Sequence, residues 1–94
     1  MEIRKTAVAG TMESSDVYVE IAPGCGKLEV TLDSVVQEQF GEEILRVVDE
    51  VLAEQGVTDA SLHLYDRGAL ECVIRARVET AILRAFLRRY RRAP

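Results

Sequence analysis

Residues 28–56, "LEVTLDSVVQEQFGEEILRVVDEVLAEQG", decide the fold because the spacing of apolar side chains changes within this one stretch. Leu28, Val30 and Leu32 alternate with polar residues, which is the pattern of a strand with one buried face. Apolar residues then recur three or four positions apart, and this spacing predicts an amphipathic helix. The helical stripe consists of Val36, Phe40, Ile44, Val47, Val48, Val51 and Leu52. We therefore expect a strand followed directly by a helix.

The ends of this helix are marked by residue type. Asp33 or Ser34 is the expected start, because Ser34 and Gln37 have the spacing of a capping box. Gly56 is the expected end, since glycine adopts the left-handed conformation that closes many helices. Gly41 is a weak point inside the helix and costs about 1 kcal/mol relative to alanine.

Two strands are predicted before this stretch, at residues 3–9 and 16–22. The second alternates apolar and polar side chains, and the loop "GTMESS" at 10–15 separates the two strands. "PGCGK" at 23–27 contains the proline and glycines of a turn. We therefore expect residues 16–22 to form a hairpin with residues 28–32.

The sequence after the helix predicts a strand at 60–65, a turn at 66–68 and a last strand at 69–77. Alternation across 69–77 places three side chains inward, those of Leu70, Cys72 and Ile74. Arg75 and Arg77 fall on the polar phase of that strand and are expected to be solvated charges. From about Val78, helical spacing returns through Ile82, Leu83, Phe86 and Tyr90.

This order of elements predicts an α+β fold for one small domain spanning residues 1–94. Strands joined by short connections and followed by helices favour a mostly antiparallel sheet, with a long central helix and a C-terminal helix packed on one face. The chain contains 94 residues, of which 48% are hydrophobic and 30% charged, as in a globular domain.

The charge distribution argues against binding of nucleic acid by the folded surface. The net charge is −4, although an Arg-rich tail begins at about residue 84 and leaves the remainder more acidic. Phosphate contacts need a basic surface, so only the tail is suited to an acidic partner. No apolar run is long enough to cross a membrane, and residues 1–10 lack the apolar stretch of a signal peptide. We expect a cytoplasmic protein.

Neither cysteine has a partner at the spacing of a zinc or redox site, so no metal site is predicted. Cys25 lies in the glycine-containing turn and is expected to be exposed, whereas Cys72 is expected in the core. His63 is the only histidine, and its position between two leucines predicts a solvent-facing strand residue. Catalysis by a serine or cysteine would depend on this histidine alone, and we therefore predict no catalytic residues.

Ser14 and Ser15 lie between acidic residues in the predicted loop at 10–15, ahead of an alternating strand. The strained "G-x-S-x-G" turn of serine hydrolases is absent, which argues against a nucleophile. An exposed loop serine is instead suited to receive a phosphoryl group or a pantetheine-type arm from another enzyme. "LDSVV" at 32–36 resembles the attachment motif of ordinary acyl carrier proteins, but a strand precedes Ser34 and helix capping explains it.

Three blocks of the sequence resemble the acyl carrier protein of bacterial citrate lyase, its gamma subunit. They are "AGTMESSD" at 9–16, "QFGEEILRVVDEVLAEQGV" at 39–57 and "DRGALECVIRARVETAILRA" at 66–85. The third is similar to a family block that usually reads Asp-Lys-Gly-Ala-Leu, so Arg67 replaces a lysine. Met12 likewise replaces a leucine, and the tail is not a family hallmark.

This resemblance implies that Ser14 receives a phosphoribosyl-dephospho-CoA group through a phosphodiester, with Ser15 as a neighbour that shapes the loop. Glu13 and Asp16 are then expected to present the loop or to dock the modifying transferase. The implied protein catalyses no step itself. It carries acetyl and citryl thioesters between an alpha subunit, which exchanges acetate for citrate, and a beta subunit, which releases oxaloacetate. A prosthetic-group transferase and an acetylating ligase are the other implied partners.

Three alternatives remain open from the sequence. The acyl carrier subunit of malonate decarboxylase uses the same kind of prosthetic group. A cofactor-free interaction module would use its acidic body and Arg-rich tail to bind a larger partner. RNA binding by the tail alone requires a steep loss of affinity with added salt.

Overall fold

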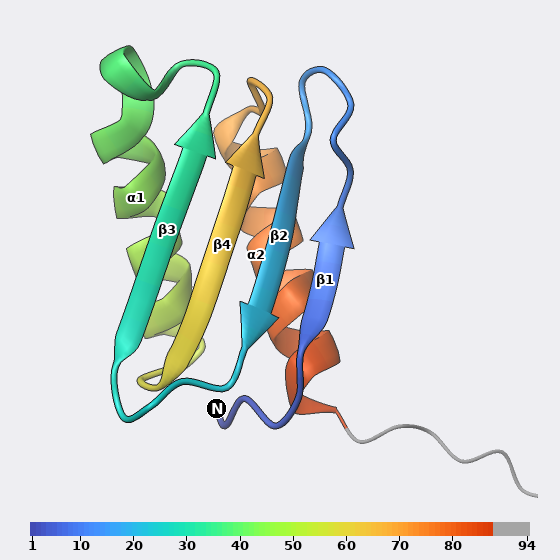
Figure 1. The fold of residues 1–94 in the computed structure, drawn as a ribbon, viewed down its shortest axis with the longest axis vertical. Helices are drawn as coiled ribbons and strands as arrows, with labels where there is room; N and C mark the ends of the chain where they lie inside the picture. Colours follow the sequence, from blue (N-terminus) through green and yellow to red (C-terminus); the bar gives the residue numbers. More distant parts are fainter. Residues whose placement is uncertain (88–94) are drawn as a thin grey trace, which may run out of the picture.

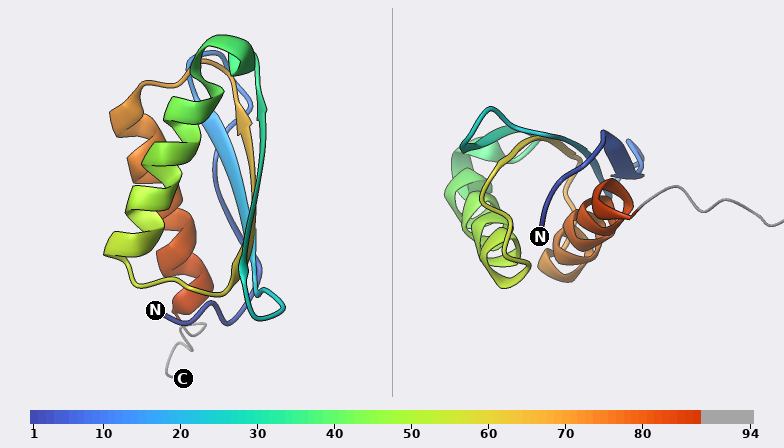
Figure 2. Two further views of the ribbon diagram at one scale, coloured as in Figure 1. Left: turned by 90° about the vertical axis from the view of Figure 1, so that its left-hand side faces the viewer. Right: turned by 90° about the horizontal axis from the view of Figure 1, so that it is seen from below.

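A computed structural model describes residues 1–87 of the chain. The elements in chain order are β1 (Ala7–Gly10), β2 (Val17–Ala22), β3 (Leu28–Ser34), α1 (Gln37–Glu54), β4 (Ala60–Asp66) and α2 (Glu71–Phe86). They form one four-stranded sheet with both helices on the same face (Figures 1 and 2). The α+β prediction, with helices packed on one side of the sheet, is confirmed.

The sheet has the order β1-β2-β4-β3. Two of its pairings, β1 with β2 and β2 with β4, are antiparallel, so the sheet is mostly antiparallel as predicted. The third, β3 with β4, is parallel, because α1 carries the chain back to the end of the sheet where β3 began. Figure 1 shows β3 and β4 running in the same direction.

The predicted hairpin between residues 16–22 and 28–32 is wrong. β4 lies between β2 and β3 and pairs with both, so the turn at 23–27 joins strands that are not neighbours. The reason is the crossover through α1, which returns the chain alongside β3, so β4 pairs in parallel with β3 and pairs with β2 along its other edge. β2 and β4 are therefore the two inner strands of the sheet, and each is hydrogen-bonded along both edges.

The predicted last strand at 69–77 is also wrong, because α2 already begins at Glu71. Leu70 is 70% exposed and Cys72 is exposed, so only Ile74 of the predicted inward set is buried. Its buried partners follow at helical spacing and are Val78, Ala81, Ile82 and Ala85. The short run of alternation at 70–74 is therefore accidental, and the helical period begins before Val78.

The boundaries of the other elements differ from the prediction in small ways. β1 is shorter than residues 3–9, although Ile3 packs in the core with 6% exposure. α1 begins at Gln37 because β3 continues to Ser34. Gly56 does close the helix with a φ of +67°, and the N–H of Val57 donates to the carbonyl of Leu52 at 2.9 Å.

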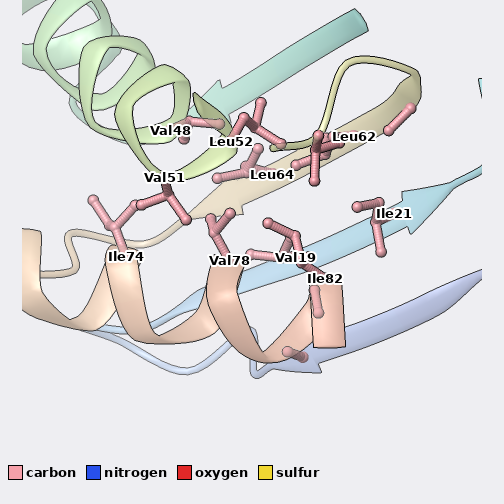
Figure 3. Close-up of a cluster of buried hydrophobic side chains, with 14 of the residues drawn as sticks. Val19, Ile21, Val48, Val51, Leu52, Leu62, Leu64, Ile74, Val78 and Ile82 are labelled. Atoms are coloured by element: carbon pink, nitrogen blue, oxygen red, sulfur yellow. The ribbon is translucent and has the colours of Figure 1, made fainter. Parts of the chain in front are cut away.

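The core lies between the sheet and the two helices (Figure 3). Leu64 from β4 and Val19 from β2 meet Val51 of α1 and Val78 of α2, and each of the four is completely buried. Phe40 was expected in the apolar stripe of α1 but lies in the first turn of the helix and is 55% exposed. Within residues 1–87, neither helix has the length and hydropathy needed to span a membrane.

Candidate functional site

The serine loop, residues 11–16, connects β1 to β2 at one end of the sheet. β3 and β4 both end there, and α1 and α2 both begin there, so the β1–β2, β3–α1 and β4–α2 connections share this end (Figure 1). Ser14 and Ser15 form the turn of the loop, and both are exposed. The loop is therefore presented at the edge of the molecule and not across a face of the sheet.

Asp16 anchors the C-terminal side of the loop through both carboxylate oxygens. Its Oδ2 accepts hydrogen bonds from Thr11 Oγ1 at 2.7 Å and from Arg77 Nη2 at 2.9 Å. Its Oδ1 accepts from Arg77 Nε at 3.1 Å and from the N–H of Val17 at 2.8 Å. The Arg77 guanidinium, followed by the Thr11 hydroxyl, lowers the pKa of Asp16 to about 2. This carboxylate remains charged at every physiological pH.

The expectation that Asp16 presents the loop is thus supported by its contacts. Arg77 was expected to be a solvated charge on a strand, whereas it lies on α2 and forms a bidentate pair with Asp16. Arg75, two residues before Arg77, links α2 to α1 through Glu50 and Glu54. Sequence reasoning missed both pairs because it placed these arginines in the wrong element. The helical spacing of apolar residues from Ile74 onward is the signal that would have placed both arginines on a helix.

Ser15 shapes the turn, as the resemblance implied. Its φ is +63°, a left-handed conformation that is uncommon for any residue except glycine. Its N–H donates to the carbonyl of Arg67 at 2.8 Å, and the N–H of Arg67 donates to the carbonyl of Asp16 at 2.9 Å. This pair of hydrogen bonds, which we call the backbone clamp, joins the serine loop to the turn between β4 and α2.

Gly10 begins the loop in a conformation that only glycine permits. Its φ is +90°, and a Cβ atom built there would lie 1.8 Å from the carbonyl oxygen of Val17. The chain must therefore reverse with two backbones in close approach. Both ends of the loop are therefore fixed, and Ser14 lies between these two anchors.

Ser14 has the features of an acceptor of a group supplied by another enzyme. Within residues 1–87 its hydroxyl makes no hydrogen bond to another side chain or to the backbone, and the residue is exposed. A nucleophilic serine needs a general base within hydrogen-bond reach. His63 is engaged elsewhere, with Nε2 at 2.6 Å from Asp33 Oδ2 and its ring stacked on Tyr65. The residues described here do not assemble a catalytic triad at Ser14.

The other predicted residues lie apart from Ser14 or have structural roles. Ser34 accepts a hydrogen bond from the N–H of Val36 and donates one to Asp66, while the Gln37 side chain accepts from the N–H of Ser34. The Ser34 hydroxyl caps the N–H of Val36 and not that of Gln37, so only the Gln37 half of the capping box is formed. Cys25 is exposed, as predicted, and His63 is half-buried on the sheet face that carries no helix.

Two hollows lie at this end of the molecule. One has a volume of about 280 Å³ and is lined by Met12, Asp33, Ser34, Val35, Gln37, Tyr65, Asp66 and Arg67. The other, of about 350 Å³, is an apolar groove between the first turns of α1 and α2. The two hollows share Asp66, and the first includes a residue from the loop itself.

Comparison with known proteins identifies relatives over nearly the whole chain. Residues 4–85 match the model of the acyl carrier family described as the malonate decarboxylase delta subunit (MdcD). The citrate lyase acyl carrier protein of Pectobacterium carotovorum is 53% identical over 85 residues, which cover 90% of this chain and 88% of that protein. The citrate lyase acyl carrier protein of Klebsiella pneumoniae is 51% identical over 86 residues, with coverages of 90% and 89%.

A solved structure has the same fold. A chain in the crystal structure of a Pseudomonas malonate decarboxylase hetero-tetramer, in complex with malonate, superposes with a TM-score of 0.77 at 24% identity. The match covers 90% of this chain and 88% of that chain. At this identity the likeness extends to the arrangement of strands and helices.

Proposed function

The chain belongs to the acyl carrier protein family that includes the citrate lyase acyl carrier proteins and the malonate decarboxylase delta subunit, and from this membership we propose that it carries acyl groups on a prosthetic arm attached to Ser14. The observation that carries the proposal is the exposed Ser14, which makes no hydrogen bond within residues 1–87 and lies between the Asp16 anchor and Gly10. A serine held in this way at the edge of a domain is accessible to a transferase and leaves an attached arm free to reach other sites.

Citrate lyase is the enzyme that we propose for this carrier. The citrate lyase relatives are 49% to 53% identical across 90% of the chain, whereas the malonate decarboxylase chain is 24% identical. The malonate decarboxylase carrier is therefore the second candidate, favoured by the description of the family model.

The arm that we propose is the phosphoribosyl-dephospho-CoA group, joined to the oxygen of Ser14 by a phosphodiester. When bound, this group supplies a terminal thiol that carries acyl groups as thioesters. The residues of this chain fit such a group because the Ser14 hydroxyl is unengaged and no side chain covers it. Thr11, Asp16 and Arg77 hold the loop, and none of them is required to move a proton.

We propose the partners that this role requires. They are the alpha and beta subunits of citrate lyase, the transferase that attaches the arm and the ligase that acetylates it. The compartment is then the cytoplasm, and the carrier unit is the single domain of residues 1–94. Tethering raises the local concentration of the thioester at both active sites, which is the physical advantage of a carrier over a diffusing acyl-CoA.

The first experiment compares the intact mass of the wild-type protein with those of Ser14→Ala and Ser15→Gly, each purified from cells that produce the citrate lyase subunits and the transferase. Glycine is the matched change at position 15 because it accepts a φ of +63°. We expect the mass of the phosphoribosyl-dephospho-CoA group on wild-type protein and on Ser15→Gly, mapped to Ser14, and its loss in Ser14→Ala.

Two results would count against the proposal. Loading of Ser14→Ala together with an unloaded Ser15→Gly would move the attachment to Ser15. An unmodified wild-type chain from citrate-fermenting cells would favour a cofactor-free interaction module. Reconstitution of the loaded carrier with the purified catalytic subunits of each enzyme then separates the two candidates, because turnover of malonate in place of citrate identifies the second candidate.

A further inference from the structure

We propose that the hollow beside the serine loop, lined by Arg67, Met12 and Tyr65, binds the nucleotide section of the arm next to Ser14, with the Arg67 guanidinium paired to its phosphodiester. This inference rests on the proposed function, because it assumes a phosphate on Ser14. It goes further by assigning a noncovalent binding site on the carrier to a chemical class of ligand, a ribose phosphate joined to a purine.

The first observation is the position of Arg67. The backbone clamp fixes this residue against the loop, with hydrogen bonds of 2.8 Å from the N–H of Ser15 and 2.9 Å to the carbonyl of Asp16. Ser14 is the residue next to the clamp, so a phosphate on its oxygen is formed beside Arg67. An arginine presents several N–H donors in a plane, which suits a phosphodiester with its pair of free oxygens.

The second observation is that Arg67 is available. Arg46, Arg75 and Arg77 each form ion pairs within residues 1–87, and in the same range Arg67 forms none. The nearby carboxylate of Asp16 is already neutralised by Arg77, and that of Asp33 contacts His63. The guanidinium of Arg67 is therefore free to pair with an anion without first breaking an ion pair within this range, and the clamp keeps its backbone beside the loop.

The third observation is the chemistry of the hollow. Its volume of about 280 Å³ lies near the lower end of the range for small-ligand sites. Met12 and Tyr65 supply apolar surface for a purine, and Met12 is 48% exposed at present. Asp33 and Gln37 also line the hollow, and Asp33 Oδ2 and Gln37 Oε1 already contact His63 and the N–H of Ser34. Asp33 Oδ1 and the Gln37 amide N–H groups remain suited to hydrogen bonds with ribose hydroxyls. The adjoining apolar groove contains no side chain suited to a phosphate.

The consequence is a two-part arm. Its nucleotide section is held close to the carrier, whereas the pantetheine section beyond it stays free to move. Holding the first section shortens the part that swings, which raises the effective concentration of the thiol at a docked active site. Arg67 is thus a positioning residue, since it touches the attached group and not the reacting atoms at the thiol.

The test is NMR spectroscopy of the full chain in two forms, loaded and unloaded, each verified by intact mass. We expect loading to shift the Nε–Hε resonance of Arg67, the methyl resonance of Met12 and the ring resonances of Tyr65. Ser61 and Lys5, at the other end of the sheet, serve as reference positions. A loaded protein in which only Ser14 and its sequence neighbours shift would overturn the inference and leave the proposed function intact.

Two variants test the role of the charge. Arg67→Gln removes the cation, Arg67→Lys retains it, and Lys5→Gln is a matched loss of one exposed charge far from Ser14. We expect the ³¹P resonance of the phosphodiester and the Tyr65 shifts to change in Arg67→Gln, to be largely restored in Arg67→Lys and to be unaltered in Lys5→Gln. Equal spectra for Arg67→Gln and Lys5→Gln would contradict the pairing with phosphate. If wild-type protein carries no arm, the proposed function fails and the inference with it.

Discussion

At the scale of single residues, Asp16 shows how one side chain organises a loop. Four donors converge on its carboxylate, from Thr11, Val17 and Arg77. A carboxylate stabilised in this way contributes to folding only while it is ionised. The loop that presents Ser14 therefore depends on an ion pair between Asp16, the residue before β2, and Arg77 of α2, which is distant in the sequence.

We predict that Asp16→Asn lowers the free energy of unfolding by about 1 to 2 kcal/mol at pH 7. The lowered pKa of Asp16 sets the upper limit of this loss, and water around the half-exposed Arg77 weakens the ion pair and reduces it. Because the folded pKa of about 2 lies below the ordinary value of 3.8, this contribution is complete above about pH 4 and is lost as the pH falls toward 2.

The measurement is urea unfolding of wild type and variant at pH 7 and at pH 2.5. The difference in stability should shrink at the lower pH. Asp49→Asn, an exposed change on α1, is the control and should have little effect at either pH. A difference for Asp16→Asn that is the same at both values of pH would show that geometry, and not charge, holds the loop.

At the scale of elements, α1 is weakened by a glycine, Gly41, at its fifth position. Gly41 is buried in the first half of the helix, where an added Cβ would lie 3.2 Å from Cγ of Gln37. That neighbour belongs to an exposed side chain, which can move by a few tenths of an ångström. The gain in helix propensity is therefore larger than the cost of crowding.

We predict that Gly41→Ala stabilises the protein by up to about 1 kcal/mol, since glycine is less favourable than alanine by this amount inside a helix. Thermal unfolding followed by circular dichroism measures the change. Gly26→Ala is the contrasting variant, because the φ of Gly26 is +95° in a turn, and alanine should destabilise there. A lower melting temperature for Gly41→Ala would mean that the hydrogen bond from the N–H of Ser34 to Gln37 fixes that side chain.

At the scale of the whole molecule, the sheet and the helix layer share one core. Leucines in similar sequence patterns differ in whether they are buried in it. Leu64 is fully buried between the sheet and both helices, whereas Leu70 is 70% exposed at the start of α2. A small domain with a single core has little stability to lose. Removal of one central side chain therefore affects the fold as a whole.

We predict that Leu64→Ala lowers the free energy of unfolding by about 3 kcal/mol, as expected for a cavity in a packed core, while Leu70→Ala changes it by less than about 0.5 kcal/mol. Urea unfolding at pH 7 measures both. Similar losses for the two variants would show that Leu70 is covered in the folded protein.

The parts of this protein that depend on local patterns could be predicted from the amino-acid sequence. Period-two and helical spacing defined β2, β3, α1 and β4, glycine at 56 defined the end of α1, and the motif around Ser14 indicated the family. These features follow from neighbouring residues along the chain, so no knowledge of long-range contacts was needed.

The neighbours of each strand, the start of α2 and the contacts that hold the serine loop depend instead on long-range packing. Alternation in β2 and β3 is the same whether they pair with each other or with β4. The crossover through α1 places β4 beside β3, and β4 then pairs with the edge of β2 that the hairpin prediction gave to β3. Five alternating residues at 70–74 fit both a strand and a helix, and packing of Ile74, Val78 and Ile82 against the sheet selects the helix. That choice brings Arg77 to Asp16, across 61 positions of sequence, because contacts of this range depend on the assembled fold.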